Sequence, residues 1–209
     1  MRPESIADDD APWQQRKSSQ MQVRILEATI DCLVEKGYAG LTTNEIVQRT
    51  GVSRGAMHHH FPQRAGLVEA VVEYALYQRM HMFLDSYQTA FKRSKRSNFI
   101  EVATELHWRN VQSREFGALL ELMVASRTDT DLADFYIPAL RKYDKVWADE
   151  MMRNFPEWAR QWRDLQVASD FAMAAHVGLL LYKPMFSASR TRAVRDLISK
   201  TCIDLHNLE

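Results

Sequence analysis

The stretch that decides the fold is LTTNEIVQRTGVSRGAMHHHFPQRAGL, residues 41–67. Its spacing predicts a short helix, a turn, a second short helix and the start of a third. Thr42 and Glu45 match a capping box, in which a hydroxyl and a carboxylate satisfy backbone N–H groups at a helix start. Gly51 is predicted to end that helix, because glycine adopts the left-handed conformation at little steric cost. Ser53 is then suited to cap the second helix.

Two helices joined by such a turn form a helix-turn-helix, whose second helix enters the major groove of DNA with its N-terminus leading. The residue sizes agree with this role, because Gly55 and Ala56 allow the backbone to approach base edges closely. Arg54 carries a guanidinium group that suits guanine or a phosphate. Arg64 begins the next helix, where a cation and unpaired N–H groups favour a phosphate. We therefore expect this stretch to bind DNA.

Eight residues follow the pattern T-T-x-x-I-(six residues)-S-x-G-(two residues)-Y-x-H-F-x-x-K-x-x-L: Thr42, Thr43, Ile46, Ser53, Gly55, His60, Phe61 and Leu67. This pattern resembles the DNA-binding domain of the TetR family of bacterial transcription regulators. A preceding helix over residues 19–36, ended by Gly37, also fits the family. His58 stands where the family usually has Tyr, and Arg64 where it usually has Lys. Both substitutes can hydrogen-bond a phosphate.

The resemblance implies a ligand-responsive regulator, most often a repressor, that binds a palindromic operator as a homodimer. Helix 54–60 of each subunit is then expected to enter successive major grooves. The expected phosphate contacts come from Thr43, His58, His59 and Arg64, and the expected base contacts from residues 54–56. The full set of expected DNA-binding residues is Thr42, Thr43, Asn44, Ser53, Arg54, Gly55, Ala56, His58, His59, His60 and Arg64.

Composition and charge agree with a small DNA-binding region on an ordinary globular chain. Hydrophobic residues make up 46% of the 209 residues, enough for a substantial core. The 27 Lys and Arg balance the 27 Asp and Glu, yet residues 14–64 hold seven basic and four acidic residues, a local charge of +3. Cys32 and Cys202 lie far apart with no metal or redox spacing, which favours a cytoplasmic setting. We find no signal peptide and expect no membrane-spanning segment.

The sequence predicts an all-α fold with three regions. Residues 1–18 are expected to form a flexible arm, residues 19–66 the helix-turn-helix domain, and residues 67–209 a helical domain for effector binding and dimerisation. Besides the three N-terminal helices, we predict helices over 63–84, 96–112, 114–127, 131–155, 159–186 and 190–207, about nine in all. Pro138 is expected to bend the fourth of these or to mark its start, and Pro184 to limit the fifth.

The last two predicted helices carry apolar stripes with small residues, which the family pairs into a four-helix bundle between two subunits. The expected dimer interface is Leu165, Ala168, Ala172, Ala175, Leu179, Val194, Leu197, Ile198, Cys202 and Leu205. The alternative is that these residues fill the core of a single chain.

Aromatic and methionine side chains of the C-terminal region suit an apolar or aromatic effector. The candidate pocket residues are Met82, Trp108, Phe116, Met123, Tyr143, Trp147, Met151 and His176. Ordinary core packing is the competing interpretation for each of them.

Other function classes receive less support from the sequence. The run His58-His59-His60 does not predict a metal site, because consecutive side chains on a helix point about 100° apart. We find no glycine-rich phosphate loop, nucleophile elbow or zinc-helix motif, so we expect neither an enzyme nor a cofactor. A DNA-binding protein whose helical body binds a partner protein instead of a ligand remains open.

Overall fold

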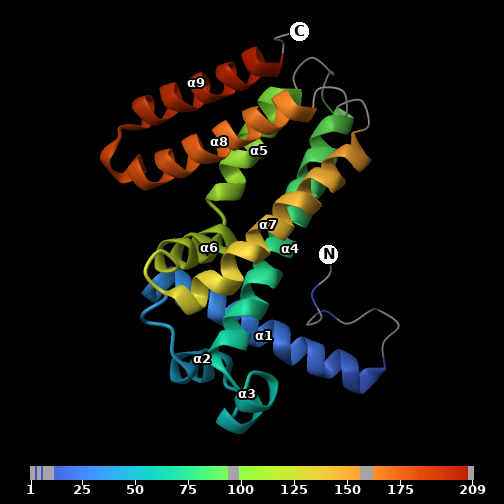
Figure 1. Ribbon diagram of the computed structural model, residues 1–209, viewed down its shortest axis with the longest axis vertical. Helices are drawn as coiled ribbons and strands as arrows, with labels where there is room; N and C mark the ends of the chain where they lie inside the picture. Colours follow the sequence, from blue (N-terminus) through green and yellow to red (C-terminus); the bar gives the residue numbers. More distant parts are fainter. Residues whose placement is uncertain (1–2, 4–5, 7–11, 94–98, 156–161, 207–209) are drawn as a thin grey trace. The chain divides into compact units, whose positions relative to one another are not determined.

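In a computed structural model, residues 3, 6, 12–93, 99–155 and 162–206 are described, and these residues form nine α-helices and no strand (Figure 1). The helices are α1 (Trp13–Lys36), α2 (Thr43–Thr50), α3 (Arg54–His60), α4 (Arg64–Arg93), α5 (Phe99–Val111), α6 (Arg114–Ala125), α7 (Thr130–Asn154), α8 (Trp162–Tyr182) and α9 (Ala188–His206), with a 3-10 turn η3 (Lys183–Met185) after α8. The predicted all-α class is confirmed. The predicted ends at residues 96–98, 159–161 and 207 lie outside the described residues.

The first helix is longer than predicted. It begins at Trp13, directly after Pro12, and not near Ser19. Residues 13–18 are exposed, so they carry no apolar stripe that would have marked them as helical. The Lys17 ammonium lies 5.1 Å from the centre of the Trp13 ring and supports this first turn. Residues 13–18 of the predicted arm are therefore helical, and residues 1–2, 4–5 and 7–11 lie outside the described part.

Two further helix boundaries differ from the prediction. Helix α4 continues to Arg93, nine residues past the predicted end, and Tyr87 continues the buried stripe of Met80 and Phe83 beyond that end. Helix α7 begins at Thr130 and continues through Pro138, so the proline does not mark its start. Pro138 lies on the exposed side of the helix. The carbonyl that loses its backbone donor therefore has access to water.

The chain divides into two compact units, each made of two separate segments. Unit 1 comprises Met1–Arg79 and Arg114–Val146, and unit 2 comprises Met80–Ser113 and Trp147–Glu209. Unit 1 therefore contains the predicted helix-turn-helix together with α6 and the first part of α7. The boundary predicted at residues 66 and 67 stays a prediction about function.

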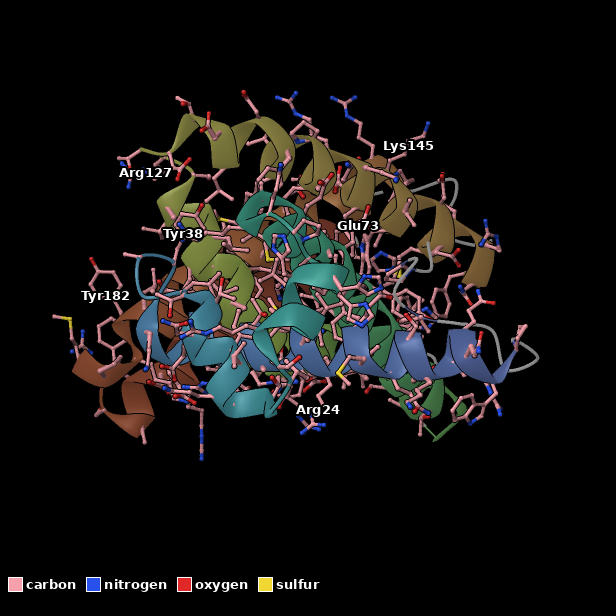
Figure 2. The ribbon with its side chains drawn as sticks, turned by 90° about the horizontal axis from the view of Figure 1, so that it is seen from below. Arg24, Tyr38, Glu73, Arg127, Lys145 and Tyr182 are labelled. Atoms are coloured by element: carbon pink, nitrogen blue, oxygen red, sulfur yellow. The ribbon has the colours of Figure 1, made fainter. Side chains whose placement is uncertain are left out.

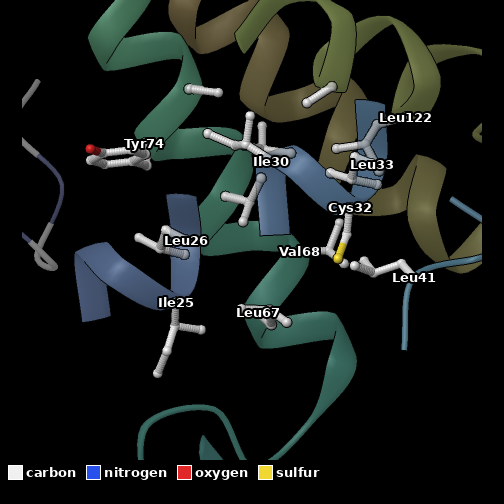
Figure 3. Packing of buried hydrophobic residues seen from close by; sticks show 14 of the residues in the cluster. Ile25, Leu26, Ile30, Cys32, Leu33, Leu41, Leu67, Val68, Tyr74 and Leu122 are labelled. Carbon is white, nitrogen blue, oxygen red and sulfur yellow. The ribbon is translucent and has the colours of Figure 1, made fainter. Parts of the chain in front are cut away.

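The core of unit 1 explains why α6 belongs with the N-terminal helices. Leu26, Ile30 and Leu33 of α1 are fully buried, and Leu122 of α6 packs in the same cluster (Figure 3). Val68 of α4 completes this group. Helices α2 and α3 are too short to cover the whole of α1, so α6 covers its remaining face.

Unit 2 is built from the second half of α4, the end of α7, and the helices α5, α8 and α9. Helices α8 and α9 lie side by side, and both contact α5 (Figure 1). An aromatic group joins α4 to the end of α7: the Phe83 ring stacks on Tyr87 at 5.8 Å and meets Trp147 edge-on at 4.9 Å. Tyr87 also meets Phe155 edge-on at 4.9 Å.

Helix α8 is apolar on both its inner and its outer face. Six of the ten predicted dimer residues are buried within the single chain: Leu165, Ala168, Ala172, Leu179, Ile198 and Cys202. Ala175, Val194 and Leu205 are half-buried, and Leu197 alone is mostly exposed, at 61%. Contacts with α5 and between α8 and α9 already cover the six buried residues, which favours core packing for them.

The exposed apolar residues of α8 form a different stripe, with Val167, Phe171 and Leu181 at its centre. By length and composition alone, Trp162–Met185 is apolar enough to cross a membrane, which the sequence analysis did not expect. Only 28% of its most apolar window is buried within the chain. One such helix is weak evidence for a membrane span, and a surface covered by another protein chain has the same composition.

Candidate DNA-binding surface and effector site

Both helices of the predicted helix-turn-helix are capped by the expected hydroxyl groups. The Thr42 hydroxyl accepts a hydrogen bond from the Glu45 backbone N–H at 3.3 Å, and the Ser53 hydroxyl accepts one from Ala56 at 3.1 Å. The carboxylate half of the predicted capping box is different. Glu45 instead binds Lys36 at 2.5 Å and Arg49 at 3.1 Å. Ion pairing across α1 and α2 therefore takes the place of the reciprocal cap.

The turn between α2 and α3 is fixed by three residues. Gly51 has the predicted left-handed conformation, with φ of 68°, and its N–H donates to the Val47 carbonyl. Val52 is buried, as expected for a residue that fills the space between the two helices. Thr50, which the sequence analysis did not single out, accepts from the Val52 N–H and donates to the Ile46 carbonyl at 2.7 Å.

Helix α3 is anchored on one side and exposed on the other. Met57 is buried, with 2% of its surface exposed. Arg54, Gly55, His58 and His59 are exposed, whereas the expected contacts Ala56 and His60 are half-buried. Exposure at the helix N-terminus is what a reading helix requires, since these residues are expected to reach the base edges first.

A small depression of about 80 Å³ brings the ends of three helices together. Thr42 and Thr43 come from the start of α2, His58 from α3, and Gln63 and Arg64 from the start of α4. Two helix N-termini thus border the same space, and N–H groups at such ends favour an anion. The remaining expected residue, Asn44, is exposed in the first turn of α2 but does not line the depression.

Arg64 is held in place by Tyr38, a residue the sequence analysis missed. The Arg64 guanidinium lies 4.2 Å from the centre of the Tyr38 ring and donates a hydrogen bond to the Tyr38 carbonyl at 2.7 Å. A guanidinium group has five N–H donors, so this contact leaves donors for a phosphate.

Not every cation near the helix-turn-helix contributes to a positive surface. Arg49 binds Glu35 at 2.6 Å and Glu45 at 3.1 Å, and Lys36 binds Glu45. Hydrogen bonds from these cations hold the pKa of both carboxyls below its usual value. Arg24 has no such partner among the described residues, and its side chain projects away from α1 (Figure 2). These ion pairs cancel within the +3 total, so the local positive potential comes from the remaining cations, among them Arg24 and Arg54.

The consecutive histidines take separate positions. The His59 and His60 rings meet edge-on at 5.4 Å, and burial with the nearby His59 lowers the pKa of His60. Within the part of the chain that the structure describes, no group of three or more His, Cys, Asp or Glu side chains is placed to hold a metal ion.

The eight residues predicted to line an apolar effector pocket are divided between the two units. Phe116, Met123 and Tyr143 belong to unit 1, and Met82, Trp108, Trp147, Met151 and His176 to unit 2. Met82 and Met123 are exposed, whereas Trp108, Phe116, Met151 and His176 are buried. Trp147 packs on Phe83, and Trp108 lies 5.5 Å from the His176 ring. The sequence showed their apolar character but not which element each side chain faces.

A groove of about 460 Å³ in unit 2 has a different chemistry from the one predicted. Eight of its nine lining residues are polar, and His176 is the only predicted pocket residue among them. The other lining residues are Glu101, Thr104, Glu105, Arg195, Asp196, Ser199, Lys200 and Ile203. The Nδ1 atoms of His176 and His107 are 2.8 Å apart, so one ring must donate and the other accept. Burial and nearby Arg195 lower the pKa of His176 to about 4, which makes its ring neutral at pH 7.

Comparison with known proteins agrees with this architecture. The profile described as "Bacterial regulatory proteins, tetR family" matches residues 25–71. An HTH-type transcriptional regulator of Mycobacterium tuberculosis is 32% identical over 153 residues, 70% of this chain and 76% of the relative. The transcriptional repressor AcnR of Corynebacterium glutamicum is 37% identical over 67 residues, 32% of each chain.

A solved structure shares the fold over nearly the whole chain. It is a transcriptional regulator from Saccharomonospora viridis in complex with choline, with a TM-score of 0.57 and 17% identity over 87% of this chain and 95% of that one. The profile match falls on the helix-turn-helix, and the mycobacterial relative extends the similarity over most of the chain. The chain therefore belongs to the tetR family of bacterial regulatory proteins, which regulate transcription by binding DNA and are not enzymes.

Proposed function

We propose that this protein is a repressor that binds a palindromic operator as a homodimer and leaves it when a small effector binds. The observation that carries the proposal is the depression shared by α2, α3 and α4. It gathers Thr43, His58 and Arg64 beside the exposed N-terminus of α3, so phosphate contacts and base contacts are available on one surface. In this arrangement Arg54, Gly55 and Ala56 approach the bases, and His59 approaches a neighbouring phosphate.

The operator can be found by selecting protein-bound duplexes from a random DNA pool. Selection is expected to enrich an inverted repeat, because a two-fold symmetric reader needs a two-fold symmetric site. Arg54→Ala is then expected to weaken operator binding by about 1–3 kcal/mol and to relax preference at one base pair in each half-site. Fluorescence anisotropy against the selected site and single-base variants measures both effects.

Arg127→Ala is the matched control for this experiment. Arg127 is an exposed cation of unit 1 that follows α6, so its removal changes the net charge equally without touching the reading helix. It is expected to leave sequence preference unchanged. Selection of no repeat, or equal loss of preference in both variants, would argue against α3 as the reading helix.

The outer face of α8 supports the homodimer part of the proposal. Val167, Phe171, Ala174, Gly178 and Leu181 recur at steps of four, three, four and three residues along the helix. This spacing places them on one stripe of the kind that packs against another helix. Three of them are large, exposed apolar residues, and Leu197 on α9 adds a fourth. A second copy of this chain would cover both helices.

Sedimentation equilibrium tests this interface. Phe171→Glu is expected to shift the protein from dimer to monomer, because it would bury an unpaired carboxylate between subunits. Ser169→Glu adds the same charge at an exposed position of α8 outside the stripe, and it is expected to remain dimeric. A dimer that both variants preserve would place the interface elsewhere.

Regulators of this family bind small effectors, and the choline complex shows one related fold with a small ligand in place. An effector releases the operator only if it binds more tightly to the state that cannot bind DNA, with a coupling of about 1–3 kcal/mol.

We also propose a cytoplasmic setting, where a bacterial operator is found. The similarity to AcnR, which is named a repressor, supports repression rather than activation, and it covers about a third of the chain.

A further inference from the structure

The polar groove of unit 2 has two walls of different charge. Helix α5 contributes Glu101, Thr104 and Glu105, which lie on one helical face. Helix α9 contributes Arg195 and Lys200, with other residues of the same face. The first wall is acidic, and the second carries both cations of the groove.

Two charged side chains are already paired across the groove, and two others are unpaired. Arg195 of α9 binds Glu105 of α5, which neutralises this part of the groove. Glu101 lies one turn before Glu105 on its helix, and Lys200 lies beyond Arg195 on the other. Neither Glu101 nor Lys200 takes part in an ion pair among the residues that the structure describes. Both are exposed to solvent along the open groove.

Ser199 and Asp196 add a hydroxyl group and a third carboxylate to the lining of the groove. The Ser199 hydroxyl oxygen is buried and has no hydrogen-bond partner within the described part of the chain. This oxygen is not accessible to solvent, so a molecule in the groove does not reach it without a change of side-chain conformation. Asp196 adds a third carboxylate, and the lining charges therefore sum to −1 from three carboxylates and two cations.

We propose that this groove binds a small zwitterion, with its ammonium group at Glu101 of α5 and its carboxylate at Lys200 of α9. A simple anion would be repelled by the excess of carboxylates. A simple cation would leave the Lys200 ammonium group without a partner of opposite charge. A molecule with both charges pairs with the unpaired carboxylate of one wall and the unpaired ammonium group of the other. The volume of about 460 Å³ lies within the usual range for small-ligand sites. The effector role rests on the function proposed above, whereas binding itself is independent of DNA.

Isothermal titration of the full chain with 4-aminobutanoate tests the proposal, with butylamine and butanoate as probes that carry one charge each. The zwitterion is expected to bind at least about tenfold more tightly than either single-charge probe. Glu101→Gln is expected to remove its advantage over butanoate, and Lys200→Gln its advantage over butylamine. Glycine and 6-aminohexanoate, which are shorter and longer zwitterions, then report the separation of the two charged ends.

Arg192→Gln is the matched control, because Arg192 is an exposed cation of α9 that does not line the groove. It is expected to leave all affinities unchanged. Both groove substitutions replace exposed side chains, and circular dichroism checks that each variant is folded. The proposal is overturned if none of the three zwitterions binds the folded protein, or if the Glu101 and Lys200 variants bind 4-aminobutanoate as tightly as the unchanged protein does.

Operator binding by the same preparations separates the two proposals. Zwitterion binding without any operator binding would leave the groove assignment standing and contradict the repressor. Operator binding without zwitterion binding would contradict only the groove assignment.

Discussion

Arg114, the first residue of α6, is the main polar connection between α6 and α1. Its guanidinium binds Glu27, and it donates to Asp31 at 2.8 Å, both on α1. Glu27 in turn accepts from the Tyr74 hydroxyl of α4 at 2.6 Å. Burial opposes the charge of Arg114, but hydrogen bonds to the two carboxylates outweigh it and raise its pKa. Arg114→Gln should therefore destabilise unit 1.

The expected size of the effect follows from the exposure of the three side chains. They are 38%, 33% and 37% exposed for Arg114, Glu27 and Asp31, so water and salt screen the pairs. Pairs of this kind contribute about 0.2–1 kcal/mol each. Removal of the cation also leaves two carboxylates one helical turn apart, which costs about 0.2–0.5 kcal/mol. We expect a total loss of roughly 1–2 kcal/mol in the free energy of unfolding.

Urea unfolding followed by circular dichroism measures the change, and hydrogen exchange at α1 amides assigns it to unit 1. The control is Arg127→Gln, an equal charge change that is expected to stay within about 0.5 kcal/mol of the unchanged protein. A double-mutant cycle with Glu27→Gln should give a coupling of about 0.5–1 kcal/mol that shrinks in 1 M salt, where the Debye length is about 3 Å.

Three results would refute this reasoning. Arg114→Gln could be as stable as Arg127→Gln, the cycle could show no coupling, or the loss could be independent of salt. The third result would mean that packing of the arginine stem, and not its charge, holds α6 against α1.

The remaining predictions concern pH and salt. Arg49→Gln should reduce the loss of stability on acidification below pH 4.5. Its carboxylate partners have lowered pKa values, so their contribution to the free energy of unfolding is present above the ordinary carboxyl pKa and disappears as pH falls. Thermal unfolding from pH 7 to 3 measures this difference. His176 has a pKa lowered to about 4, so the unfolded chain takes up its proton first as pH falls below about 6.5. The protein should therefore lose about 2 kcal/mol between pH 8 and pH 5 that His176→Gln does not lose, and equal pH profiles would contradict the neutral buried ring. Arg64→Ala should weaken binding to all DNA sequences and lower the slope of log affinity against log salt by about one, and an unchanged slope would remove Arg64 from the phosphate contacts.

Features set by neighbouring residues could be predicted from the sequence. The Thr42 and Ser53 caps and the left-handed Gly51 were all predicted correctly, because each depends on residues a few positions away. The pairing of Glu45 with Arg49 had a visible signal too, since opposite charges four residues apart attract on a helix.

Features set by distant residues could not be predicted in this way. Arg114 and Asp31 are 83 residues apart, and His107 and His176 are 69 residues apart. Nothing in the local pattern of one residue indicates the other. The sequence could not separate dimer residues from core residues for a related reason, because an apolar helix such as α8 has two apolar faces. Only the packing of α5 and α9 decides that Leu165 faces inward and Val167 outward.

Unit 1 is built from two segments of the chain that are synthesised at different times. Residues of α1 leave the ribosome early, yet Leu119 and Leu122, which share their core, follow only after the whole of α5 has been made. At a translation rate of about 5–20 residues per second, the nascent helix-turn-helix spends several seconds with the α6-facing side of α1 uncovered. Completion of the core that holds the helix-turn-helix therefore depends on a helix that lies far outside the motif itself.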